Sequence, residues 1–421
     1  MSEQTKPSVL SVVAMGMLAF LIIGSYDLAR PAAESMFLKA YGSKSLPYVW
    51  LAVAAAAAGV VALYGRFAKD RSLLAVMAVV SLISAALAAV LLLGLRAHVP
   101  GAPFLLYVFK DVYVVVLIEI FWSYANSVFP IRTARWIYGL FCVMGSGGGA
   151  LMNLVSGRIA AASTGTAFAQ ALVGRSDEGS GTLVALSALV PMLMVLAVAA
   201  TVAAKVAPRV ARPDKQDTDK SYTEGLRLVR ASRYLTLMLA LIALSQLTIT
   251  LVDYQFNAGI ELYEADTDRR TTLMGYVAAS YNIGAVLLQL GTGVIITLLG
   301  VRRVLPSIPG ILGATLLAFL VAPHVALLAA AKVLSKVLDY SLFRATKELL
   351  YIPLTYAEKT QGKAVIDMLT YRVAKGGASL LLLAVVALDT PRVVGWLTLG
   401  VIATWVFVSV RLARRYTGES A

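Results

Sequence analysis

Long runs of apolar residues, separated by short polar segments, dominate the pattern along this chain. A helix that crosses a bilayer needs roughly 20 mainly apolar residues, and several of the runs that reach this length are interrupted by charge. The candidate spans cover residues 9–30, 47–66, 73–95, 103–128, 136–160, 181–206, 233–256, 272–299, 304–322, 325–354, 364–388 and 393–411. The pattern therefore predicts an all-α polytopic membrane protein with about twelve transmembrane helices.

A single long polar stretch, residues 208–232, divides the chain into parts of similar size. Residues 1–207 and residues 233–421 each contain six of the predicted spans. Two six-helix halves joined by a cytoplasmic linker form the plan of the major facilitator superfamily. Within the linker, Ser221 and Glu224 have the spacing of a capping box ahead of the amphipathic stretch that begins at Leu226, so we expect a short helix on the cytoplasmic surface.

The loop after the second predicted span resembles a signature of the same superfamily. It reads Gly65-Arg-Phe-Ala-Lys-Asp-Arg71, and in the superfamily the glycine, the aspartate and the arginine tie neighbouring helices together at the cytoplasmic face. The corresponding loop of the second half keeps only Gly300-Val-Arg-Arg303, so the match is partial.

Composition and charge agree with a membrane protein. Apolar residues make up 59% of the chain and charged residues 14%, about half of the roughly 25% that is usual in soluble domains. The net charge of +14 comes mostly from short loops between apolar runs, which indicates the positive-inside effect rather than a surface that binds nucleic acid. This distribution predicts a multi-pass protein, in a bacterial inner membrane, with both termini in the cytoplasm.

Several classes of site are not expected. The lone Cys142 lies in an apolar segment, and His98 and His324 are isolated, so neither a disulfide nor a metal site is predicted. The sequence has no GxxxxGK[ST] motif, and its glycine-rich segment, residues 145–149, is read as a helix-packing site. We expect a non-enzyme without cofactors, a monomer in the lipid bilayer whose partner is a small anionic molecule.

The tenth predicted span, residues 325–354, has the densest set of charges inside an apolar segment. Such charges are costly in a membrane, so they usually face a cavity or a partner. The group that falls within a sector of about 80°, at about 100° per residue, consists of Lys336, Tyr340, Arg344 and Lys347. A basic stripe of this kind suits an anion with several phosphate oxygens. The alternative is pairing of Lys336 with Asp339 and of Arg344 with Glu348, which would leave Lys332 and Lys347 over.

The fourth predicted span has two polar faces. Lys110 and Tyr113 share one of them. The opposite face has the spacing i, i+3, i+4 and i+7 and consists of Glu119, Trp122, Ser123 and Asn126. A base could stack on the indole ring, and Glu119 could accept a hydrogen bond from an amine or carry a proton. The alternative is that this face packs against a neighbouring helix.

Three further spans carry charges that are candidates for the central cavity. They are Asp27, Arg30 and Glu34 at the end of the first span, Asp253 in the seventh, and Arg372 and Lys375 in the eleventh. The first and seventh helices line the cavity in the superfamily plan, so Asp27, Glu34 and Asp253 are candidates for coupling or gating. Arg30 and Glu34 could equally form a gating ion pair.

The tenth and eleventh spans resemble a known family. The matching block reads Tyr340-Ser-Leu-Phe343, Thr346-Lys-Glu348, Tyr351-Ile-Pro-Leu354, Gly362-Lys-Ala364, Ile366-Asp367 and Lys375-Gly-Gly377. Shorter similarities are Phe121-Trp122 with Ala125-Asn126, and, more weakly, Tyr26, Leu28 and Arg30. Together these segments are similar to the ATP/ADP translocase family, the nucleotide transporters of plastids and intracellular bacteria.

The resemblance implies a twelve-helix fold related to the major facilitator superfamily and exchange of one nucleotide for another by alternating access. It also implies that Lys347 contacts phosphate, with Glu348 beside it. The first helix departs from the family pattern, because Ala33 stands where the family has a lysine, although the acidic residue that follows is kept as Glu34. This departure leaves open whether ATP and ADP are the substrates.

The predicted function is therefore secondary transport of a nucleotide of the ATP/ADP type, or of a related phosphorylated anion. Positive charge would come from two sets of residues, Lys336, Arg344, Lys347, Arg372 and Lys375 in the second half and Arg30 and Lys110 in the first. Glu119 and Asn126 would orient the base or another polar group.

Two other hypotheses belong to different classes. A proton-coupled exporter of amphipathic or lipid-like substrates would use Asp27, Glu34 or Glu119 as the protonated group. A membrane subunit or receptor without transport activity is disfavoured, because a passive scaffold has little reason to carry so many charges inside its spanning helices.

Overall fold

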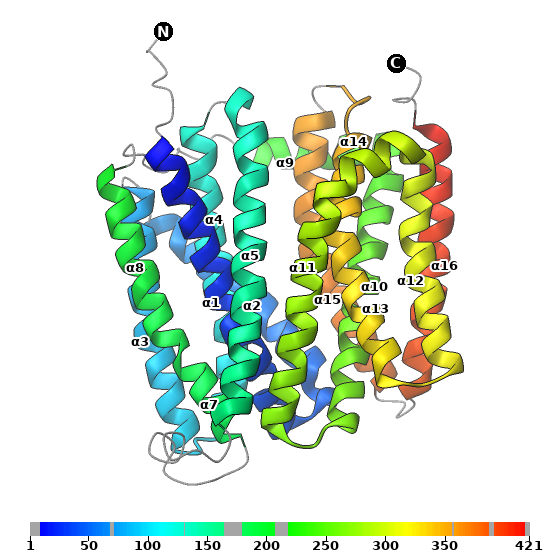
Figure 1. Ribbon diagram of the computed structural model, residues 1–421. Coiled ribbons are helices and arrows are strands. Elements are labelled where there is room, and N and C mark those ends of the chain that lie inside the picture. Colours follow the sequence, from blue (N-terminus) through cyan, green and yellow to red (C-terminus); the bar gives the residue numbers. More distant parts are fainter. Residues whose placement is uncertain are drawn as a thin grey trace. The chain divides into compact units, whose positions relative to one another are not determined.

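The computed structural model describes residues 9–67, 71–129, 131–163, 179–206, 218–355, 358–386 and 391–416 (Figure 1). These residues form helices and no strand, and each of the twelve predicted spans falls on a helix or a helix pair, which confirms the predicted all-α class. The first six spans correspond to α1 (Val9–Tyr41), α2 (Leu46–Phe67), α3 (Leu73–Arg96), α4 (Ala102–Val128), α5 (Ile131–Ser163), and α7 (Ser180–Ser187) with α8 (Leu189–Val206). The second six correspond to α10 (Arg233–Tyr263), α11 (Thr267–Leu299), α12 (Val301–Val321), α13 (Val325–Leu338) with α14 (Arg344–Leu350), α15 (Lys363–Val386) and α16 (Pro391–Arg415).

By length and hydropathy, eight of the helices in the described part of the chain qualify as membrane spans. The set does not include α2, α4, α13, α14 or α15. α13 and α14 are too short because a π-helical turn, η2 (Asp339–Phe343), separates them. The predicted span over residues 325–354 is therefore helical from Val325 to Leu350, with a π turn in its interior.

Contacts divide the described residues into two compact units. Unit 1 comprises those within Met1–Gly42, Ala52–Asp214 and Glu264–Ile283, and unit 2 comprises those within Ser43–Leu51, Lys215–Tyr263 and Gly284–Ala421. The first half of α11 therefore packs with unit 1 and its second half with unit 2. The predicted boundaries of two sequence halves, at residues 207 and 233, remain a prediction.

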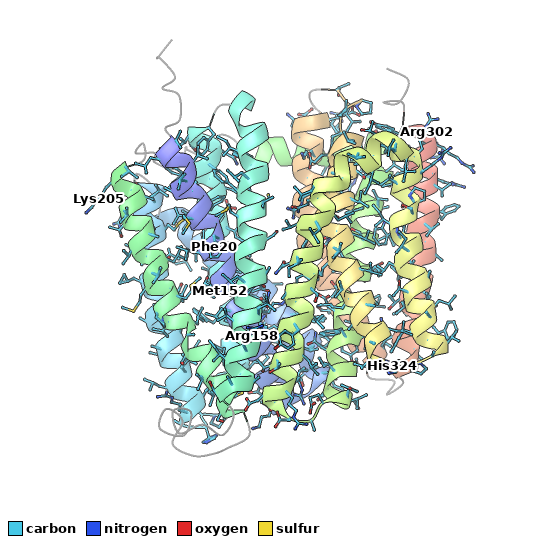
Figure 2. The ribbon with its side chains drawn as sticks, viewed as in Figure 1. Phe20, Met152, Arg158, Lys205, Arg302 and His324 are labelled. Carbon is cyan, nitrogen blue, oxygen red and sulfur yellow. The ribbon has the colours of Figure 1, made fainter. Side chains whose placement is uncertain are left out.

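Close packing of α1 against α5 organises unit 1 (Figure 1). A β-carbon on Gly148 of α5 would overlap the carbonyl oxygen of Phe20 on α1, and one on Gly24 would lie 3.1 Å from the Cγ atom of Met152. Figure 2 marks Phe20 and Met152 on these two neighbouring helices. The glycine-rich segment over residues 145–149 is therefore a packing site, as predicted.

The helix α1 extends eleven residues beyond the predicted end at Arg30, to Tyr41. The prediction stopped there because charged residues interrupt the apolar run. In the structure Glu34 is buried and paired within the protein, and Pro31 lies inside the helix. Because Glu34 is paired with Arg30 inside the protein, its charge does not require the helix to end at Arg30.

Unit 2 has its own core, in which α10 and α12 pack against α16. The Phe343 ring meets Trp405 edge to face at 5.7 Å between centroids. A π turn shifts the hydrogen-bond pattern of the helix by one residue, and here the side-chain amide of Gln289 on α11 donates to the carbonyl oxygen of Tyr340 at 2.9 Å. This bond gives one carbonyl of η2 a partner outside its own helix.

The predicted surface helix in the linker is present as α9 (Thr218–Ala231). It begins at Thr218, so the backbone of Ser221 lies inside the helix and not at the predicted N-cap position. A β-carbon on Gly225 would lie 2.6 Å from the carbonyl oxygen of Gln361, so α9 lies tightly against the short π-helical segment η3 (Glu358–Gly362) and the start of α15.

The α1–α5 contact gives a stability prediction. Gly148→Ala should lower the free energy of unfolding by about 1–3 kcal/mol, because the new methyl group meets backbone that cannot move away as a flexible side chain does. The matched control is Gly147→Ala on the same helix, where a β-carbon meets nothing within 4 Å and loss of glycine should be neutral or stabilising by up to about 1 kcal/mol. Thermal unfolding in detergent measures both, and equal midpoints would contradict the packing argument.

Candidate functional site

A first cluster of charges joins α1 and α4 within unit 1. The Arg30 Nε atom lies 3.0 Å from the Glu34 carboxylate. Lys110, only 1% exposed, has its Nζ atom 2.9 Å from Asp111 and 3.7 Å from Glu34. A buried lysine without a counter-charge would be strongly destabilising, so Glu34 and Asp111 make the position of Lys110 tolerable.

Tyrosines complete this cluster. The Tyr26 hydroxyl donates to Asp111 at 3.0 Å, and the Lys110 ammonium lies 3.9 Å from the centroid of the Tyr107 ring. Arg30 donates from Nη1 to the hydroxyl of Tyr281 on α11 at 2.8 Å. Tyr107 and Tyr281 were not identified from the sequence. Tyr107 precedes Lys110 by three residues, a helical spacing that could have indicated their contact. Tyr281 lies 251 residues from Arg30, so no local signal could have indicated that contact.

Asp27 lies beside this cluster and is 4% exposed. Its carboxylate accepts a hydrogen bond at 3.0 Å from the side-chain amide of Asn282 on α11. A β-carbon on Gly149 of α5 would overlap the Asp27 Oδ2 atom. Three helices thus enclose the carboxyl group, and Asn282 is a contact that the sequence analysis missed.

A second cluster lies in unit 2 between α10 and α13. The Asp253 carboxylate is shared by two lysines, with Lys332 Nζ 2.6 Å from Oδ1 and Lys336 Nζ 3.1 Å from Oδ2. The lysines are 3% and 8% exposed. The Lys332 ammonium also lies 5.4 Å from the centroid of the Phe256 ring. Two buried ammonium groups thus share the carboxylate of Asp253, and Asp339 also interacts electrostatically with Lys336.

The structure gives two of these residues partners that the sequence did not suggest. Lys336 forms an ion pair with Asp253 on another helix, in addition to its electrostatic interaction with Asp339. Glu348 pairs with Lys363 at 2.5 Å, where the sequence had suggested Arg344. Asp253 and Lys363 lie 83 and 15 residues away from Lys336 and Glu348, so helical spacing could not identify them. Their proximity depends on the tertiary fold.

The basic residues of the tenth span differ in exposure. Lys336 is buried on α13, whereas Arg344 is exposed and Lys347 is half-buried on α14. All three interact electrostatically with Asp339 in the π turn between these helices. Their common role as a basic stripe remains a prediction.

The polar face of α4 is present as predicted, and α5 contributes to it. Glu119 and Asn126 are exposed, and Trp122 between them is half-buried. The Tyr138 hydroxyl on α5 donates to Asn126 Oδ1 at 2.7 Å, and the Tyr138 ring lies 5.1 Å from the Trp122 ring, edge to face. Part of this face thus contacts a neighbouring helix, as the packing alternative proposed, while Glu119 and Asn126 retain exposed surface.

The remaining expectations concern α15 and metal ions. Arg372 and Lys375 lie on α15, but their side chains are outside the described residues.

Ala33 is fully buried, so a lysine at this position would have to enter the core of unit 1. Among the described side chains, no group of three His, Cys, Asp or Glu residues could hold a metal ion.

A family model described as TLC ATP/ADP transporter matches residues 103–328 and 304–416, which is more than half of the chain. ADP,ATP carrier protein 1 of Chlamydia pneumoniae is 25% identical over 378 residues, which cover 78% of this chain and 70% of that relative. ADP,ATP carrier protein 3 of Rickettsia conorii is 24% identical over 307 residues, which cover 64% of this chain and 60% of the relative. The aligned regions therefore leave a substantial part of both relatives unmatched.

Solved structures share the fold. The nucleoside transporter NupG matches with a TM-score of 0.66 at 12% identity, over 97% of this chain and 100% of that structure. A bacterial homologue of the iron transporter ferroportin, in an inward-facing state, matches with a TM-score of 0.67 at 13% identity, over 96% and 99%. At such identities the likeness concerns the fold alone, which this chain shares with both transporters.

The shared carboxylate generates a prediction about unit 2. Asp253→Asn should cost about 3–5 kcal/mol of stability, because it removes the carboxylate that two buried lysines share. Glu348→Gln is the matched control, since it breaks a pair whose side chains are 32% and 50% exposed and should cost within about 1 kcal/mol. Chemical or thermal unfolding compares the two, and similar losses would show that Asp253 is not the structural counter-charge.

Proposed function

The chain belongs to the TLC ATP/ADP transporter family, and from this premise we propose that it exchanges one nucleotide of the ATP/ADP type, or a related phosphorylated anion, for another by alternating access. The fold supports secondary transport, in which the two halves rock about a central site. The chain needs no cofactor for this activity, because the exchanged solutes supply the driving force.

The observation that carries the proposal is the pair of buried lysines in unit 2. Lys332 and Lys336 share the carboxylate of Asp253 inside an apolar helix bundle. Ionisable groups inside spanning helices are costly and usually serve substrates or ions. A polyanionic phosphate chain would accept several charge-assisted hydrogen bonds from such ammonium groups.

Lys347 and Arg344 extend this positive region beyond the π turn. Lys347 is half-buried and Arg344 is exposed, so neither carries the full desolvation cost of a core cation. The family resemblance gives Lys347 a role in phosphate contact, and Glu348, beside it, is held by Lys363. We assign Lys336, Arg344 and Lys347 to the phosphates, with Arg372 and Lys375 as further candidates on α15.

Unit 1 has a different charge balance. Arg30 and Lys110 share their surroundings with Glu34 and Asp111, and Asp27 is buried next to them. Each cation therefore already has a carboxylate partner within the protein. We propose that Arg30, Glu34 and Lys110 act mainly in gating, and that the phosphate chain depends on unit 2. The fully buried Ala33 agrees with this division, because the lysine that the family carries there is missing.

The membrane setting follows from the fold, and its finer details are part of the proposal. The chain is a multi-pass membrane protein. We place it in a bacterial inner membrane as a monomer, with both termini in the cytoplasm, because the basic loops predicted after even-numbered spans would then lie inside.

A proton-coupled exporter is the second candidate, and one observation favours it. Asp27 is enclosed by α1, α5 and α11 and accepts a hydrogen bond from Asn282. A carboxyl group in such a place could carry a proton across the membrane. The substrate would then be amphipathic, and transport would follow a pH gradient.

Ligand-induced stabilisation tests the leading proposal. ATP or ADP should raise the unfolding midpoint of the purified protein, equivalent to about 2.7 kcal/mol at a concentration about 100 times Kd. Lys347→Ala should remove most of the shift because a phosphate contact is lost. Lys205→Ala is the matched control, since this lysine is exposed at the end of α8 (Figure 2), and it should keep the shift. Stabilisation by lysolipids, with none by any nucleotide or sugar phosphate, would reject the proposal.

Transport in proteoliposomes separates the two candidates. Uptake of labelled ATP should require nucleotide inside the vesicles and should not change when the pH gradient is collapsed, because exchange moves one polyanion against another. Asp27→Asn should retain this exchange if Asp27 has only a structural role beside Asn282. Uptake that needs no internal nucleotide, follows the pH gradient and is lost in Asp27→Asn would establish the exporter instead.

A further inference from the structure

Unit 2 has a cluster of exposed arginines that the proposed transport function does not use. The Arg302 Nη2 atom donates to the carbonyl oxygen of Tyr416 at 3.1 Å, so the start of α12 lies beside the end of α16. Figure 2 labels Arg302 at this end of α12. The exposed arginines at this junction, which we call the arginine patch, are Arg302, Arg303, Arg411, Arg414 and Arg415.

The arginine patch has no counter-charge on its own helices, because neither α12 nor α16 contains an Asp or Glu residue. The positive-inside effect accounts for basic residues on one side of a membrane, but it does not require that two distant segments share one patch. Arg302 and Tyr416 are 114 residues apart in sequence, so the fold concentrates charge that the sequence keeps separate. Positive charge concentrated in this way attracts an anionic ligand.

The lengths of the two helices place the arginine patch at the membrane surface. α16 has 25 residues and α12 has 21, which correspond to about 37 Å and about 31 Å along the axis, whereas the hydrocarbon layer is about 30 Å thick. Arginines in the terminal turns of such helices lie at the level of the lipid headgroups, where long basic side chains commonly extend.

Exposed apolar side chains continue from the patch toward the middle of both helices. Phe407 on α16 is 55% exposed and Ile311 on α12 is 44% exposed. The Arg411 guanidinium lies 4.4 Å from the centroid of the Phe407 ring, so charge and apolar surface meet at this point. A ligand that matches both parts has an anionic head and apolar chains.

We propose that the arginine patch binds the phosphate of an anionic phospholipid, with the acyl chains of the lipid along the exposed apolar faces of α12 and α16. Arginine suits this ligand because its planar guanidinium donates two parallel hydrogen bonds to phosphate oxygens and stays charged at any working pH. The site lies wholly within unit 2, and it does not depend on which solute the protein transports.

The experiment measures lipid binding to the purified full-length protein by native mass spectrometry, with phosphatidylglycerol as the anionic probe and phosphatidylcholine as the neutral one. Wild type should bind phosphatidylglycerol at least about tenfold more tightly. An arginine near an anionic membrane surface contributes about fivefold to binding, so Arg414→Gln/Arg415→Gln should weaken phosphatidylglycerol binding by about tenfold or more and leave phosphatidylcholine unchanged.

The matched control is Arg96→Gln/Arg158→Gln, which removes two exposed arginines from α3 and α5 and should change neither lipid by more than about twofold. Arg303→Gln tests the contribution of α12 with a single exposed substitution and should weaken phosphatidylglycerol binding by about fivefold. A variant that had lost its structure would instead have a lower unfolding midpoint and would lose both lipids, and Arg303→Gln then decides the question by itself.

Three results would overturn the lipid site. The first is equal binding of the two lipids by wild type, and the second is an equal loss of phosphatidylglycerol binding in the patch variant and in the control. The third concerns glycerol phosphate, which has the phosphate group without acyl chains and should not displace phosphatidylglycerol at equal concentration. Displacement would show that the arginine patch binds a soluble phosphate anion and not a lipid.

Discussion

The pairing of buried charge is the constraint on which this structure depends. Lys332 and Lys336 are held by the single carboxylate of Asp253, and Lys110 is held by Glu34 and Asp111. An unpaired ammonium in such places would oppose folding by several kcal/mol. The positions of α10 against α13, and of α1 against α4, are therefore tied to these contacts as well as to apolar packing.

The two clusters differ in how their charges are arranged. In unit 1, cations and carboxylates are interleaved with tyrosines, and Arg30 also donates to Tyr281 on α11. In unit 2, the Asp253 carboxylate is shared by two lysines, and Asp339 interacts electrostatically with Lys336, Arg344 and Lys347 along the same span.

The helix α11 makes polar contacts within each of the two units. Its first half packs with unit 1, where Asn282 donates to Asp27 and Asp268 accepts hydrogen bonds from the backbone N–H groups of Gly181 and Thr182 at the start of α7. Its second half belongs to unit 2, where Gln289 donates to Tyr340 of the π turn.

The sequence by itself determined the helical class, the positions of the twelve spans and the packing role of residues 145–149, because apolar length and small residues at helical spacing are local signals. It also identified Lys336, Asp253, Lys110 and Glu34, since charge inside an apolar run is visible without a structure. Only the tertiary structure decided their partners: Asp253 lies 79 and 83 residues from the two lysines that it holds. The π turn at Asp339–Phe343 and the contacts of Tyr138, Tyr281 and Asn282 were likewise beyond sequence reasoning, because helix phase and long-range contacts are set by how the helices pack.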